Sequence, residues 1–250
     1  MGIRFLQHIA ERLFEKLALT LCDVIIAQSK GVREYMLKLY GSAIESKIQI
    51  IPTGVDHTKF LQLPKLTGDK EILFVGALSE IKGVNGLITS FSRVHHKLDD
   101  SKLVLAGSGP NAPRYEKLVR ELKLENSVEF LGPVRDDRRM IELYRNSNVV
   151  VLPSNVGGPI SCTILEGLSS GRPVISTNVP GGIPDVVDDA VGGLIAPEDI
   201  DGLTEKLFRF LQDKEYADQI GYNARQRIVE KYTLDLMIDE LLSLYTELAA

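Results

Sequence analysis

A glycine and a lysine in the segment 75–83 are of the types that bind the phosphates of a ligand. Gly76 directly follows an apolar run, and because it has no side chain it would let a ligand approach the backbone. Lys82 lies where the next helix is expected to begin, and the positive end of a helix dipole disfavours a lysine there unless an anion is bound. A bound diphosphate would explain Lys82, and a solvated surface lysine explains it equally well.

The segment 152–167 offers a larger set of candidate ligand contacts. Gly158 belongs to a Gly-Gly turn after an apolar run, and a helix is expected to begin near Ser161. The backbone N–H groups of Ser161, Cys162 and Thr163 would then point outward and form an anion site. Glu166 lies one helical turn further, where its carboxylate could accept two hydrogen bonds from a ribose diol. The alternative is a helix glutamate that is exposed to solvent.

The segment 105–110 is a weaker candidate for nucleotide binding. Gly107 and Gly109 follow an apolar run, but Ala112 stands where a third glycine would be needed, and no acidic partner for a ribose is evident. The full dinucleotide-binding pattern is therefore absent. A tight turn before a helix is the preferred interpretation.

Metal binding and nucleophilic catalysis find no support in the sequence. The four histidines lack the spacing of metal ligands, and the adjacent His95 and His96 cannot share one helix face, so both are expected to be solvated. No Ser/His/Asp or Cys/His set stands out, and we expect neither a metal nor a cofactor. Cys22 and Cys162 are too few for a secreted disulfide scaffold.

Composition places the chain among ordinary globular proteins, since 44% of its 250 residues are hydrophobic and 25% are charged. The net charge of −5 argues against nucleic acid as a partner, because nucleic-acid-binding surfaces are basic. No apolar run reaches the roughly 18 residues of a membrane span, and the N-terminus lacks the pattern of a secretion signal. We therefore expect a cytoplasmic protein. An apolar helix at 3–21 is expected to pack against another domain, with peripheral membrane contact as the alternative.

Apolar, β-branched runs alternate with longer amphipathic segments along the whole chain. The runs cover residues 23–28, 47–51, 71–76, 102–107, 127–131, 148–152, 173–176 and 193–195. They are continuous rather than alternating, which is typical of strands that are buried on both faces. Regular alternation of strand and helix predicts an α/β fold with a Rossmann-like parallel sheet.

The strand candidates divide unevenly about the segment 52–70, which has little regular pattern and is interpreted as a linker. Six candidates follow it, but only two precede it, and two parallel strands cannot bury both of their faces alone. We expect residues 1–60 to be the remainder of an N-terminal domain with its linker, and residues 61–232 to be a complete C-terminal domain. Residues 233–250 should form a helix that packs back toward the N-terminal part. The missing start of the first domain would come from another chain, a second copy or residues outside this sequence.

Several of these segments, in this order, resemble a retaining glycosyltransferase of family 4, of the glycosyl transferases group 1 type with the GT-B fold. The similarity extends from about residue 10 to the C-terminus. It is carried by residues 23–29, 51–56 with Phe60, 75–83, 105–110, 129–134, 164–167, 171–176 and 180–185. The resemblance implies two Rossmann-like domains that face each other across a cleft. The N-terminal domain would hold the acceptor, and the C-terminal domain would hold a nucleotide-diphosphate sugar.

By position, the resemblance also implies roles for individual residues. Lys82 would contact the donor diphosphate, the backbone near Val134 would contact the base, and Glu166 would bind the ribose hydroxyls. The amides around Ser161 and Cys162 would cradle phosphate. Transfer in this family retains the anomeric configuration, and cations and amides rather than a metal stabilise the leaving diphosphate.

Two positions depart from the family pattern. Ala77 stands where the family usually has arginine, and loss of its charge-assisted hydrogen bonds should weaken diphosphate binding by about 1.5–3 kcal/mol. Gly158 stands where the family has a glutamate that touches the transferred sugar. Its loss should lower the rate or relax the choice of donor.

The resulting prediction is transfer of a hexose from a UDP-, GDP- or ADP-sugar to an acceptor hydroxyl. A separate N-terminal half would come from a homodimer or from a partner chain. The alternative is a non-catalytic nucleotide-sugar-binding or scaffold protein with a degenerate site. A sugar-nucleotide epimerase and a phosphorylase are disfavoured, because no acid–base side chain for the sugar and no Schiff-base lysine stand out.

Overall fold

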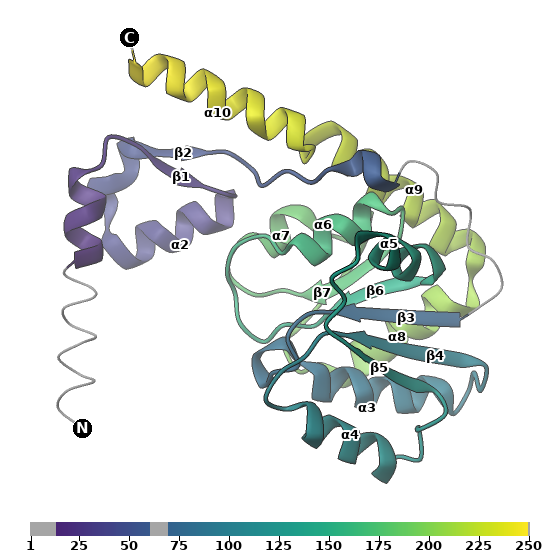
Figure 1. Cartoon of the computed structure of the whole chain (residues 1–250). Helices are drawn as coiled ribbons and strands as arrows, with labels where there is room; N and C mark the ends of the chain where they lie inside the picture. The colour runs from purple at the N-terminus through teal and green to yellow at the C-terminus, as the bar shows by residue number, and fades with distance from the viewer. Residues whose placement is uncertain (1–13, 61–69, 250) are drawn as a thin grey trace, which may run out of the picture.

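A parallel sheet of six strands forms the larger part of the structure (Figure 1). The computed structural model describes residues 14–60 and 70–249. The strands are, in chain order, β3 (Lys70–Val75), β4 (Ser101–Ala106), β5 (Val128–Gly132), β6 (Val149–Leu152), β7 (Val174–Thr177) and β8 (Gly192–Ile195). All pairs are parallel, and residues of β6 and β7 are buried throughout. The predicted α/β fold with a parallel sheet is confirmed.

Helices cover both faces of this sheet (Figure 1). One face carries α3 (Val84–His95), α4 (Ala112–Glu121) and α8 (Ile200–Gln212), and the other carries α5 (Asp137–Asn146), α6 (Cys162–Ser169) and α9 (Lys214–Lys231). Each long helix turns an apolar stripe inward. In α3 this stripe includes Leu87, Phe91 and Val94, which are fully buried, as their spacing in the sequence predicts.

The strand order is β5-β4-β3-β6-β7-β8, so the chain reverses direction across the sheet between β3 and β6. From β3 the chain moves outward to β4 and β5, and it then returns to place β6 on the other side of β3. Loops after two such strands leave on opposite faces of the sheet and open a crevice beyond the strands' carboxyl ends. We call this place the β3–β6 switch. It lies beside residues 76–83 and 153–161.

A smaller parallel sheet precedes the large one and consists of β1 (Ile25–Ala27) and β2 (Ile48–Ile50). The connection between them contains α2 (Lys30–Tyr40) and the 3-10 helix η1 (Ser42–Lys47). Residues 14–21 are helical, and the earlier part of the helix predicted at 3–21 lies outside the described residues. Over the described part of the chain, no helix combines the length and the hydropathy needed to cross a membrane.

The chain crosses between the two sheets once near residue 55 and again before its end (Figure 1). Val55 forms a bridge with Thr233, and Leu234 N–H donates to the Val55 carbonyl at 3.0 Å. The last helix, α10 (Leu234–Ala249), then runs back over β2. Phe60, in the 3-10 helix η2 (His57–Phe60), is buried in the large core. Part of the predicted linker is therefore a packed segment, and its residues 61–69 lie outside the described ones.

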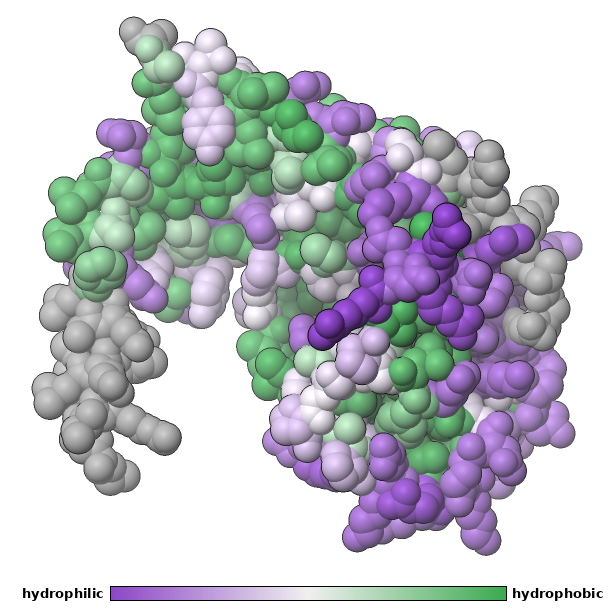
Figure 2. All heavy atoms as spheres, in the orientation of Figure 1, coloured by the Kyte–Doolittle hydropathy of each residue, from purple (hydrophilic) through white to green (hydrophobic). Residues whose placement is uncertain are grey.

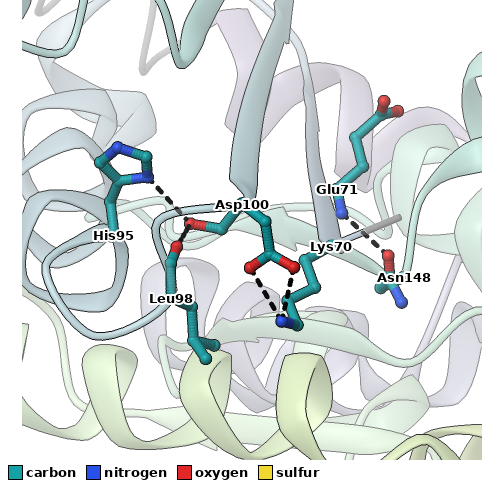
Figure 3. A network of polar contacts seen from close by, with 7 residues as sticks. Lys70, Glu71, His95, Leu98, Asp100 and Asn148 are labelled. Carbon is teal, nitrogen blue, oxygen red and sulfur yellow. Dashed lines mark hydrogen bonds and ion pairs between the residues drawn. The ribbon is translucent and has the colours of Figure 1, made fainter. Parts of the chain in front are cut away.

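Polar contacts at the amino ends of the strands fasten the sheet on the side away from the switch (Figure 3). Lys70 Nζ pairs with Asp100 at 2.7 Å, which joins the start of β3 to the turn before β4. Asn148 Oδ1 accepts a hydrogen bond of 2.8 Å from the Glu71 N–H. These contacts fix the register of the central strands at the edge opposite the candidate site.

His95 belongs to the same polar region (Figure 3). Its ring is half-buried, with Nδ1 lying 3.2 Å from Ser101 Oγ and Nε2 lying 3.0 Å from Ser127 Oγ. The prediction that His95 is solvated is therefore wrong, because the end of α3 brings the ring against the segments that begin β4 and β5. His96 is exposed, as predicted.

Candidate functional site

The loop after β3 places Gly76, Ala77 and Lys82 beside the β3–β6 switch. Residues Glu80–Lys82 form the short 3-10 helix η3, and Gly83 is the N-cap of α3. Lys82 is half-buried and lies just before α3, two residues before Val84, its first helical residue. In the part of the chain that the structure describes, no carboxylate forms an ion pair with Lys82. The charge of Lys82 is thus available to an anion.

The glycines of 105–110 allow the loop after β4 to pack against the loop after β3. A Cβ atom on Gly107 would lie 1.8 Å from Gly76 O, and a Cβ on Gly109 would lie 2.4 Å from Leu78 O. The Leu78 N–H also donates to the Ser108 carbonyl at 3.0 Å. The predicted tight turn is confirmed, and the close approach of two backbones explains its glycines without a ligand.

The N-terminus of α6 lies at the same edge and is open to an anion. Ser161 is the N-cap and Cys162 the first helical residue, which confirms the predicted helix start. The Ser161 side chain makes no capping hydrogen bond, and the first turn contains no acidic residue. The first amides of a helix lack partners within it, so they remain for a ligand. Thr163 Oγ1 donates to Val75 O at 3.2 Å and ties this helix start to the end of β3.

Glu166 lies one turn into α6 and is half-buried. Its Oε2 atom accepts a hydrogen bond of 2.7 Å from Tyr144 Oη in α5. Burial raises the pKa of Glu166 above its usual value, while the Tyr144 bond and the charge of Lys59 oppose this rise. The alternative of a solvent-exposed helix glutamate does not describe this side chain.

Tyr144 is a residue of this site that the sequence analysis missed. It is completely buried, and burial followed by the nearby charge of Glu166 holds the pKa of its phenol well above the usual range. In the sequence it is one apolar position of an amphipathic helix. No local pattern connects it with Glu166, which lies 22 residues further along the chain.

Gly158 connects the loop after β6 with the turn before α7 (Ile183–Val186). It forms an isolated bridge with Gly181, and its carbonyl accepts a hydrogen bond of 2.9 Å from the Gly182 N–H. A Cβ atom on Gly158 would meet no other atom within 4 Å. There is space at this position for the glutamate of the family pattern, although its backbone conformation favours glycine.

Val134 follows β5, the edge strand, and lies two strands away from β3. It is half-buried and packs against the core, and a hydrogen bond of 2.8 Å from Gly107 N–H to Gly132 O joins the loops after β4 and β5. The remaining predicted site residues surround the β3–β6 switch: Gly76, Lys82, Gly158, Ser161, Cys162 and Glu166. Val134 is thus on the same edge of the sheet but apart from this group.

Two cavities border these loops without containing Lys82 or Glu166 in their walls. One of about 480 Å³ lies between the starts of α3 and α8, and its walls include Glu80, Glu198 and Asp199. Arg114, in the same walls, pairs with Glu80, so Glu198 and Asp199 are the carboxylates that disfavour a diphosphate in that cavity. The other, of about 610 Å³, lies between α2 and residues 178–185. Within 14–60 and 70–249, no three His, Cys, Asp or Glu side chains are grouped to hold a metal ion.

Two family models match the chain. The model described as glycosyl transferases group 1 matches residues 56–227, which is more than half of the chain. The model described as glycosyltransferase family 4 matches residues 3–59.

Curated relatives are glycosyltransferases of several kinds. The chain is 30% identical over 238 residues to an uncharacterized glycosyltransferase of Methanocaldococcus jannaschii, an alignment that covers 90% of this chain and 60% of that protein. It is 30% identical to the O-antigen chain mannosyltransferase C of Escherichia coli, with 90% of this chain and 61% of that protein covered. The chain therefore spans about three fifths of the length of these relatives.

Solved structures of other proteins share the fold of this chain. Sucrose-phosphate synthase from Thermosynechococcus elongatus superposes with a TM-score of 0.82 at 25% identity, covering 96% of this chain and 61% of that one. The Anabaena protein Alr3699/HepE, solved in complex with UDP and glucose, gives a TM-score of 0.82 at 19% identity, covering 94% and 66%. The second likeness concerns the fold alone.

Proposed function

The chain belongs to the glycosyl transferases group 1 family and has an α/β fold of the GT-B type, and on this premise we propose that it is the donor-binding part of a retaining hexosyltransferase. The donor would be a nucleotide-diphosphate sugar. Its diphosphate would lie at the β3–β6 switch, between Lys82 and the first amides of α6. Its ribose would lie against Glu166, and its base near Val134.

One observation carries this proposal. Thr163 fastens the uncapped N-terminus of α6 to the end of β3, directly beside the loop that holds Lys82, which has no ion-pair partner among the described residues. A helix N-terminus and a lysine are both attractive to a diphosphate, and a strand-order switch is where open parallel sheets bind ligands. HepE, which shares the fold, was solved with UDP and glucose, and this supports a nucleotide sugar as the ligand.

In the proposed reaction, the protein stabilises the leaving group. The bond between the anomeric carbon and the diphosphate oxygen would break, and a bond from the same carbon to the acceptor hydroxyl oxygen would form with the same configuration. The proton of that hydroxyl would pass to the departing diphosphate. Negative charge grows on the departing diphosphate. Lys82 and the amides around Cys162 would stabilise that charge more in the transition state than in the bound donor.

The acceptor would approach from the smaller sheet. We propose that residues up to 60 and the returning helix α10 form the acceptor side, and that residues 61–232 form the donor side. The 610 Å³ cavity between α2 and residues 178–185 lies between these two parts. Asp185 Oδ2 accepts a hydrogen bond of 2.8 Å from the Gly31 N–H at the start of α2, which holds the parts together.

Calorimetric titration with UDP, GDP and ADP tests the donor site. We expect micromolar binding of one nucleotide, and we expect this binding to be lost in Glu166→Ala and weakened in Lys82→Ala. Glu230→Ala and Lys231→Ala, at exposed positions near the end of α9, are the matched controls and should bind as the original chain does. Absence of binding by all three nucleotides would instead favour a scaffold that keeps the fold with a degenerate site.

A further inference from the structure

We propose that Tyr144 is a positioning residue that holds the Glu166 carboxylate in place to receive the ribose hydroxyls of the donor. This inference rests on the proposed function, because it concerns the same site. Tyr144 would not touch the nucleotide itself. It would act through Glu166, by fixing the orientation of a side chain that otherwise has rotamer freedom.

The hydrogen bond between the two side chains leaves one carboxylate oxygen for a ligand. Tyr144 Oη donates to Glu166 Oε2 at 2.7 Å, a charge-assisted bond when the carboxylate is ionised. Tyr144 is completely buried, so water cannot take the place of its phenol. In the described residues Glu166 Oε1 makes no hydrogen bond, and it is not sealed from solvent. Oε1 is therefore the oxygen that a ribose hydroxyl can reach.

The backbone of Glu166 is fixed as firmly as its side chain. Its carbonyl accepts hydrogen bonds from Ser170 N–H at 2.9 Å and from Ser170 Oγ at 2.7 Å. On the next residue, a Cβ added to Gly167 would lie 3.0 Å from Val174 Cγ2, so α6 packs tightly on the sheet at this point. The only conformational freedom left to Glu166 is in its own side chain, and Tyr144 restricts it.

Tyr144 is itself held from two sides. The Phe60 ring of η2 meets the Tyr144 ring edge-on, with centroids 5.9 Å apart. The Tyr144 carbonyl accepts hydrogen bonds of 3.0 Å from Arg172 Nε and from Ser147 Oγ. Arg172 is buried, and burial lowers its pKa to about 10, so it is still charged at neutral pH. These contacts hold the backbone and the ring of Tyr144 at the end of α5, where its hydroxyl donates to Glu166.

The surrounding charges show why the Glu166 carboxylate needs a hydrogen-bond donor beside it. Burial favours a protonated Glu166, and Asp137 acts in the same direction, whereas the Tyr144 bond and Lys59 favour the ionised form that accepts hydrogen bonds. Lys59 Nζ is shared, because it also pairs with Asp137 at 2.9 Å. Tyr144 is thus the contact that both orients the carboxylate and opposes its neutralisation.

Tyr144→Phe tests the inference, since it removes the phenol oxygen and keeps the ring that packs on Phe60. The matched control is Tyr115→Phe, because Tyr115 is 1% exposed and its hydroxyl has no partner in the described residues. Each variant would be titrated with the nucleotide that binds best, from neutral to acid pH. The Glu166 carboxyl pKa would be followed by carbon NMR on glutamate-labelled protein, and folding by thermal unfolding.

We expect Tyr144→Phe to raise the Kd about tenfold, which corresponds to about 1.4 kcal/mol, and to move the acid loss of binding to higher pH. The NMR pKa of Glu166 should rise in parallel, and Tyr115→Phe should change none of these. If Tyr144→Phe bound like the original chain while Glu166→Ala did not, the positioning role would be overturned and the donor site would stand. If Glu166→Ala bound the nucleotide as tightly as the original chain does, both the positioning role of Tyr144 and the proposed donor site would be overturned. Weaker binding with an unchanged Glu166 pKa would mean that Tyr144 is merely structural, which also overturns the inference.

Discussion

At the scale of single residues, the charge state of Glu166 should decide the pH range in which a nucleotide binds. The Glu166 side chain accepts hydrogen bonds from ribose hydroxyls most strongly when it is ionised, and burial raises its pKa above the ordinary value of 4.5. As pH falls through this raised pKa, the carboxylate charge is lost and its hydrogen bonds weaken, so binding should weaken at a higher pH than an ordinary glutamate would cause. Titration of the nucleotide at a series of pH values measures this.

The variant Glu166→Gln separates the effect of the Glu166 charge on nucleotide binding from its effect on folding. Because burial opposes the ionised form in the folded protein, removal of the charge should leave the thermal unfolding temperature at neutral pH unchanged or raise it. The variant should bind weakly, and with no dependence on pH in the acid range. Affinity of the original chain that stays constant until the protein unfolds would contradict this assignment.

Ala77 gives a second prediction at a single position. Its side chain is exposed on the loop after β3, so an arginine can be accommodated there. Ala77→Arg should tighten diphosphate binding by about 1.5–3 kcal/mol through charge-assisted hydrogen bonds. Ile81→Arg is the matched control, because Ile81 lies on the same loop and is 55% exposed. If the two variants gained equal affinity for the nucleotide, only the added charge would matter, and position 77 would not face the diphosphate.

At the scale of elements, the close packing of the loops after β3 and β4 should be essential for the site. Gly107→Ala would force a Cβ atom to within 1.8 Å of Gly76 O, and it should destabilise the protein by about 1–3 kcal/mol or more. The control is Gly41→Ala, because Gly41 also has a positive φ but has no atom within 4 Å of its Cβ position. Urea unfolding compares the two. If Gly107→Ala lowered the free energy of unfolding no more than Gly41→Ala does, the two loops would not depend on this close packing.

The elements around the site could be predicted because their signals are local. The buried strands of a parallel sheet are continuous apolar runs, and the start of α6 at Ser161 follows a Gly-Gly turn in the sequence. The pairing of Tyr144 with Glu166, and the contacts of His95 with Ser127, could not be predicted in this way. Each joins residues from different elements, and their distance depends on how the helices pack on the sheet.

At the scale of the whole molecule, a large apolar surface extends over the smaller sheet and α10. Figure 2 shows hydrophobic residues gathered on this part of the molecule, whereas hydrophilic ones cover much of the larger part. The exposed apolar side chains there include Leu21, Ile26, Ile50, Leu236, Leu242, Tyr245 and Leu248. Surfaces of this kind are typical of protein–protein contacts. We propose that a second copy of the chain covers it.

The variant Tyr245→Glu tests this association. Light scattering at micromolar concentration should give twice the monomer mass of 27.7 kDa for the original chain and a lower mass for the variant. Tyr222→Glu is a close control, because Tyr222 is 61% exposed on α9 and Tyr245 is 62% exposed on α10. A monomeric original chain would contradict the proposed homodimer.

A crystal structure of the chain with UDP, or with whichever nucleotide binds best, would show whether a nucleoside diphosphate binds at the β3–β6 switch. We expect the phosphates at the first amides of α6 and near Lys82, and a ribose hydroxyl at Glu166 Oε1. The nucleotide should stay outside the 480 Å³ cavity between α3 and α8, whose walls contain more carboxylates than cations. A nucleotide seated in that cavity, or bound without contact to α6 and Glu166, would contradict a donor site at the β3–β6 switch.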